Sequence, residues 1–257
     1  MPPGRRALLQ SLLPAGLMAL LVRRDALAAG ARGEARRFLR SVDETSRELA
    51  ERRIRPAEWQ RRVEELARAV DLDDLRRAVD FDRVARTLEL PDEDAASIAL
   101  RIPGLRLRFA AKIFGLERGR AITPHGHRNM VSMHLVLRGQ VRARHFDRLR
   151  DERPAERGRR TGLSEPGGHL LLRPTLDATL RSGQASSISS ERDNVHWFVA
   201  QGAPAWTFDC ILSDLEPLGY SYGIDLVDPD RAERLPDGTL RAPIISWRES
   251  IDRYGKS

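Results

Sequence analysis

The chain has 257 residues, 41% of them hydrophobic, which is enough for one medium-sized core plus an accessory segment and excludes disorder throughout. Its single cysteine, Cys210, excludes an internal disulfide and a cysteine-rich zinc module, and is predicted to be a buried apolar residue. The formal charge of +7 includes +3 from residues 1–28, and the other Arg residues mostly interleave with Asp and Glu, so nucleic-acid binding is not expected.

Residues 1–28 have the pattern of an export signal. Arg5 and Arg6 precede an apolar run, and Ala26-Leu27-Ala28 has the small residues of a signal-peptidase site. The run is short for a membrane span and contains Pro and Gly, so we expect cleavage and no stable span afterwards. The paired Arg resembles a twin-arginine signal, which implies export of a folded, cofactor-loaded protein to the periplasm or beyond. A short N-terminal helix on a cytoplasmic protein is the alternative.

Residues 29–98 are predicted to form a small α-helical accessory segment. Apolar residues recur there with helical spacing, and Pro56 suits the first turn of a helix. Three stripes carry the pattern: Ala35, Phe38, Val42 and Leu49; Trp59, Val63, Leu66, Ala67 and Val70; Leu75, Val79, Val84 and Leu88. We expect three or four short helices and no catalytic residue among them.

Residues 99–257 are predicted to be mainly β, because the apolar period changes to two after Pro103-Gly104. Leu105, Leu107 and Phe109 alternate with Arg, which indicates a first strand. Further β-rich runs lie at 130–137, 140–146, 169–174, 177–182, 185–190, 195–200, 205–213 and 242–247. Many short strands with frequent turns favour an antiparallel sandwich or small barrel. The charged, Gly-rich stretch 147–168 is expected to be a mobile surface excursion.

A candidate metal site begins at His125-Gly126-His127. Alternation in an extended strand puts both imidazoles on one face, where they can chelate Fe, Zn, Ni, Cu or Mn. Pro124 stiffens the approach, and Gly126 leaves room between the rings. Two polar side chains at a strand end remain the simpler alternative for an isolated pair of this kind.

The surrounding sequence strengthens the metal interpretation through a family resemblance. TPHGHRNMVSMHLVLRGQVRARHF resembles the first cupin motif, with the turn glycine Gly139, and RDNVHWF resembles the second, with His196. The resemblance implies a cupin double-stranded β-helix in which His125, His127 and His196 hold one divalent metal. Such a triad would leave coordination positions open for substrate and dioxygen.

The type of cupin is indicated by a missing carboxylate. Ser132 stands where the usual cupin has a glutamate ligand, and a neutral three-histidine site is similar to that of the thiol dioxygenases. The spacing from His127 to Gly139 resembles the cysteamine dioxygenase and plant cysteine oxidase family over about residues 105–225. Further agreement lies in Asn194, in Asp209 and in the late Tyr220 and Tyr222.

This resemblance implies an exported oxidoreductase that uses non-haem Fe(II) and O2 to convert a small thiol into a sulfinic acid. Arg128-Asn129 replaces the family's Pro-Gly, which puts the substrate pocket in doubt. The alternatives are a non-catalytic small-molecule-binding cupin and a cupin enzyme loaded with Zn or Mn. Homodimers are common among cupins, but no residue pattern here supports one.

Other candidate residues carry less specific signals. Asp209 is a pocket residue by alignment, with an ordinary surface or hydrogen-bonding carboxylate as the alternative. His134 can face the cavity, but an ordinary packed histidine is favoured. His145 and His169 are not expected to be ligands. The sequence contains no nucleophile elbow and no Gly-rich phosphate loop.

Overall fold

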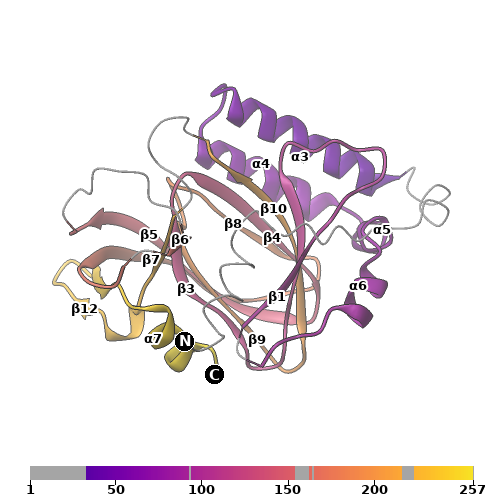
Figure 1. Cartoon of the computed structure of the whole chain (residues 1–257). Coiled ribbons are helices and arrows are strands. Elements are labelled where there is room, and N and C mark those ends of the chain that lie inside the picture. The colour runs from indigo at the N-terminus through magenta and orange to yellow at the C-terminus, as the bar shows by residue number, and fades with distance from the viewer. Residues whose placement is uncertain (1–32, 93, 154–161, 164, 216–222, 257) are drawn as a thin grey trace.

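The computed structural model describes residues 33–256 except 93, 154–161, 164 and 216–222 (Figure 1). The expected export signal, Tyr220 and Tyr222 lie outside the described residues. Within the described ranges, no helix combines the length and the apolar character needed to cross a membrane.

Four helices form the N-terminal part of the structure, as predicted. They are α3 (Glu34–Ala50), α4 (Pro56–Ala69), α5 (Leu72–Ala78) and α6 (Phe81–Thr87). Pro56 is the first residue of α4, where its missing N–H costs no hydrogen bond. The Asp71 carboxylate caps α5 by accepting a hydrogen bond from the Asp74 N–H at 2.7 Å. Together the helices cover one face of the strands (Figure 1).

The strands form two sheets. The first has the order β1 (Ala96–Ala99), β2 (Ala110–Leu116), β10 (Ala205–Ser213), β4 (Met130–Arg138) and β8 (Ala185–Ile188). The second has the order β12 (Glu233–Arg234), β13 (Leu240–Pro243), β7 (His169–Arg181), β5 (Gln140–Asp151), β9 (Val195–Ala200), β3 (Ala121–His127), β11 (Gly223–Leu226) and β6 (Gly162–Leu163). The short helix η1 (Pro229–Arg231) and the helix α7 (Trp247–Tyr254) complete the chain.

The strand order is that of a double-stranded β-helix. Strands β2, β3, β4 and β5 alternate between the two sheets, β5 pairs with β7 in the antiparallel direction, and β7, β8, β9 and β10 alternate again. The result is two facing antiparallel four-stranded units, β2-β10-β4-β8 and β3-β9-β5-β7, which is a jelly-roll arrangement. The predicted fold, a mainly β cupin-type barrel preceded by helices, is confirmed.

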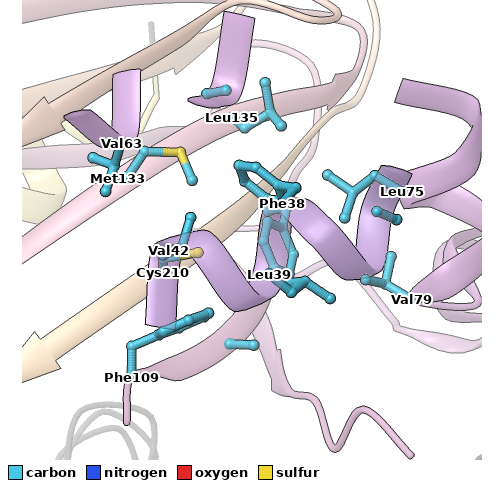
Figure 2. Packing of buried hydrophobic residues seen from close by; sticks show 14 of the residues in the cluster. Phe38, Leu39, Val42, Val63, Leu75, Val79, Phe109, Met133, Leu135 and Cys210 are labelled. Atoms are coloured by element: carbon cyan, nitrogen blue, oxygen red, sulfur yellow. The ribbon is translucent and has the colours of Figure 1, made fainter. Parts of the chain in front are cut away.

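The largest core lies between the helices and the outer face of the first sheet. Figure 2 shows Phe38 and Val42 of α3 close to Met133 and Leu135 of β4 and to Cys210 of β10. Cys210 is fully buried there, as predicted. Because β4 is covered by helices on one side and by the second sheet on the other, nearly all of its residues are buried.

Residues 105–109 are not a strand, so that prediction is wrong. The Arg108 N–H donates to the Asp43 carboxylate of α3 instead of to a neighbouring strand, and Arg36 of α3 donates to the Pro103 carbonyl at 2.9 Å. The alternation of Leu105 and Leu107 with Arg therefore reflects packing against the helical core.

Three other expectations differ from the structure. β5 continues to Asp151, so the expected surface excursion begins later, and most of its remainder lies outside the described residues. The run 242–247 is not one strand, because Ser246 forms a capping box with Glu249 that starts α7 at Trp247. β1 spans the expected boundary between the helical and β segments and pairs with β2.

Candidate metal centre

Three histidine side chains converge between the sheets. His125 and His127 lie two residues apart on β3, and His196 on β9 is the direct antiparallel partner of His125. Partners in an antiparallel pair point to the same side of the sheet, so all three imidazoles face the interior. One nitrogen from each ring lies within 4.8 Å of those from the other two. Among the described residues, this is the group of His, Cys, Asp and Glu side chains that can hold a metal ion.

The surroundings of the three rings favour the neutral form of imidazole, which is the form that binds a metal. The Nδ1–H of His125 donates to the Thr123 carbonyl at 2.7 Å, which leaves the Nε2 lone pair for a metal. Burial lowers the pKa of His125 to about 4 and lowers the pKa of His127 and His196 well below their ordinary value. Neutral imidazole is the form that binds metal, so no proton has to be displaced at neutral pH.

A divalent transition-metal ion fits this donor set. His196 Nδ1 is buried without a hydrogen-bond partner among the described residues. Ser132 faces the same space from β4, and its buried hydroxyl likewise has no hydrogen-bond partner in the described part of the chain. Three imidazoles without a carboxylate are a suitable ligand set for Fe, Zn, Ni or Cu. Because neutral imidazoles carry no charge, they do not neutralise the positive charge of the ion.

A pocket of about 100 Å³ adjoins the triad. Its walls come from both sheets and from α7, and its apolar lining includes Phe114, Met130, Ile211, Leu226 and Trp247. A few polar groups in a mostly apolar cavity are typical of a site for a small molecule.

A histidine–aspartate pair faces the triad from the opposite sheet. His134 on β4 and Asp209 on β10 are direct antiparallel partners, and His134 Nδ1–H donates to the Asp209 carboxylate at 2.7 Å. Both side chains are buried and line the pocket. His134 Nε2 has no hydrogen-bond partner among the described residues, and its ring centroid lies 5.2 Å from that of His196. His134 therefore faces the cavity, which the sequence had left as the less favoured alternative.

The pocket also contains residues that sequence reasoning missed. Lys112 on β2 is the strand partner of Asp209, and Asp94 precedes β1; both line the pocket. Burial raises the pKa of Asp94 to about 6. His145 on β5 is the partner of His196 and is buried beside it, with a pKa that burial lowers to about 3, whereas His169 begins β7. The sequence feature that could have drawn attention to Lys112 is that lysine is rare in this chain.

Arg128 and Asn129, which stand where the resembling family has Pro-Gly, make contacts next to the histidine triad. Asn129 adopts a positive φ of 56°, which asparagine tolerates better than most residues. The Arg128 guanidinium reaches the Asp151 carboxylate at 2.6 Å and that of Asp225 at 3.3 Å. The Asn194 side-chain amide donates to the His127 carbonyl at 2.7 Å. These contacts anchor the backbone that carries the second histidine of β3.

The fold and this site together define a cupin-type double-stranded β-helix with a three-histidine site suited to a metal ion. The sequence matches no family model and no curated protein.

Several solved structures match part of the chain with low similarity. Procruciferin, an 11S globulin from Brassica napus, is 13% identical over 54% of this chain and 28% of its own, with a TM-score of 0.35. A recombinant oxalate oxidase in complex with glycolate is 15% identical over 52% of this chain and 55% of its own, with a TM-score of 0.34. A cupin superfamily protein from Desulfitobacterium hafniense is 13% identical over 51% of this chain and 88% of its own, with a TM-score of 0.33. The chain spans less than a third of the globulin, and the fold assignment rests on its own strand order.

Proposed function

We propose that this protein is an exported non-haem Fe(II) dioxygenase that oxidises a small thiol to a sulfinate. The observation that carries the proposal is the triad of His125, His127 and His196 with Ser132 facing it in place of a carboxylate. The reaction adds both atoms of O2 to the sulfur of the thiol, so it needs no further oxidant or reductant.

A bound Fe(II) ion would supply open coordination positions for the thiol sulfur and O2. The protein's own residues provide the surroundings. The apolar walls limit the access of water to the reacting groups. Asp209 holds the His134 ring by its Nδ1–H, so that Nε2 faces the triad and is placed to accept the thiol proton.

The export part of the proposal is supported by the Arg5-Arg6 pair and the small residues before residue 29. A reporter fused to residues 1–35 is expected to reach the periplasm. Changing both Arg residues to Lys is expected to prevent this, and continued export of that variant would contradict twin-arginine transport.

The activity is tested by loading the purified protein with Fe(II) under anaerobic conditions and adding O2 with a panel of small thiols. We expect oxygen uptake that matches sulfinate formation one to one, as measured by mass spectrometry. Oxygen uptake without sulfinate, or no uptake with any thiol, would overturn the dioxygenase proposal. Zinc or manganese as the metal of the natively purified protein would favour the binding-protein or non-oxidative alternative.

A further inference from the structure

Lysine is rare in this chain, and one of its lysines lies in the pocket. Of the 44 Lys and Arg residues, only Lys112 and Lys256 are lysines. Lys256 is exposed near the C-terminus, whereas Lys112 is partly buried on β2 and lines the cavity. The cation in this pocket is therefore a compact ammonium group, whereas nearly all other cationic side chains of the protein carry the larger, planar guanidinium group.

The strand geometry turns Lys112 toward the ligand space. Its neighbours Ala111 and Ile113 pack into the core under the helices, so Lys112 and Phe114 point to the opposite face of β2. Burial lowers the pKa of Lys112, and the nearby Asp209 partly opposes this effect.

The charge of Lys112 is not matched by a direct ion pair. Among the described residues, no carboxylate oxygen lies within 4.0 Å of its ammonium nitrogen. Asp209, its strand partner, gives one carboxylate oxygen to His134 instead. A partly buried cation that makes no direct ion pair is a site for an anionic group.

Lys112 and the metal triad lie at different parts of the same cavity. Lys112, Asp209 and His134 are successive partners across β2, β10 and β4, which places Lys112 roughly 10 Å from His134 along the sheet. His134 is the member of this row beside the triad. A ligand that fills the pocket therefore has one end at the histidines and the other near the ammonium group.

We propose that the substrate is a thiol that also carries a carboxylate, with the sulfur at the triad and the carboxylate paired with Lys112. This inference rests on the proposed function and adds the class of its substrate. An ammonium group at the same end of the substrate would be repelled by Lys112, so an aminothiol is a poorer fit than a mercaptocarboxylate.

The test compares 3-mercaptopropionate with its neutral amide, 3-mercaptopropionamide, and with cysteamine. Binding to the Fe(II)-loaded full-length protein is measured by calorimetry without O2, so that the result does not depend on turnover. We expect the carboxylate to bind at least about tenfold more tightly than the amide, which is the order expected for one charge-assisted contact.

Three variants decide whether Lys112 is responsible. Lys112→Met and Lys112→Gln are expected to remove the preference for the carboxylate while leaving amide binding unchanged. Lys112→Arg is expected to retain most of the preference, and Lys256→Met is the matched control, with full preference. Unchanged metal content and circular dichroism establish that each variant is folded and loaded.

Two results would overturn the inference: an unchanged carboxylate-to-amide ratio in Lys112→Met and Lys112→Gln, or a wild-type protein that binds cysteamine best. A Lys112-dependent preference without sulfinate formation under O2 would instead support the carboxylate site and overturn the dioxygenase reaction.

Discussion

His127 illustrates how single residues make this site. Its position two residues after His125 sets the direction of its ring, and the Asn194 amide holds its backbone carbonyl. Burial keeps the ring neutral, which costs the folded protein little because a neutral imidazole carries no charge to desolvate. The His127 ring belongs to the group that can hold a metal ion, and it is not part of the hydrophobic core clusters.

Replacing His127 with Ala is expected to abolish stoichiometric metal binding while the barrel stays folded. Two remaining imidazoles hold a divalent ion far more weakly than three, and the hydrophobic cores contain no part of His127. Metal content by mass spectrometry and the circular dichroism spectrum check both parts. His169→Ala, which removes a histidine outside the triad, is the control. One-to-one metal retained in the His127 variant would refute the ligand assignment.

At the scale of elements, a partly buried ionic cluster joins the end of β5 to the β3–β4 turn and to β11. Arg128, Arg148 and Arg153 surround Asp151 and Asp225, and the Asp225 side chain is fully buried. Burial by itself raises the pKa of Asp151, but hydrogen bonds from the Arg residues outweigh it and hold that pKa well below its usual value. The cluster lies beside Gly126, between the two histidines of β3.

Asp225→Asn is expected to lower the free energy of unfolding by about 3–5 kcal/mol, because it removes the fully buried carboxylate that pairs with three partly buried guanidinium groups. Urea unfolding of the metal-free protein measures this. The control is Asp177→Asn, which breaks a solvent-exposed pair with Arg142 and should cost less than about 1 kcal/mol. Equal effects of the two substitutions would show that the cluster does not brace the β3–β4 turn.

For the whole molecule, enclosing histidines between two sheets couples stability to pH. Burial lowers the pKa of His125 to about 4 and that of His145 to about 3, and lowers those of His127 and His196 as well. In the unfolded chain these groups titrate near 6.5, so below that pH the unfolded state binds more protons than the folded state. Stability is therefore present above about pH 6.5 and is lost as the pH falls toward the folded values.

We expect the metal-free protein to lose stability between pH 7 and pH 5, with about 2 kcal/mol from His125 alone. Burial raises the pKa of Asp94 to about 6 and also raises the pKa of Asp193, so these two carboxylates act in the opposite direction, but they are two groups against four. Urea unfolding at both pH values checks the sign. His145→Leu should reduce the loss, whereas His169→Gln should not. A stability that is unchanged or higher at pH 5 would contradict the neutral, buried state of these histidines.

Much of the fold followed from local patterns in the sequence. The 3.6-residue period predicted the helices between Glu34 and Thr87, and the change to a period of two predicted most of the strands. The same alternation placed His125 and His127 on one face of a strand. The periodicity of a helix or strand depends only on residues that are close in the sequence. These features can therefore be deduced without knowledge of the tertiary contacts.

Only the tertiary structure decided which distant residues meet. The register of β4, β10 and β2 brings His134, Asp209 and Lys112 into one row, and a slip of one residue would have turned each side chain to the other face. The alternation at residues 105–109 predicted a strand, but the hydrogen bond from Arg108 to Asp43 commits that backbone to α3. The sequence thus determined the histidine pair and the elements around it. Long-range pairing determined the pocket that this pair faces, because strand register joins residues that no local period relates.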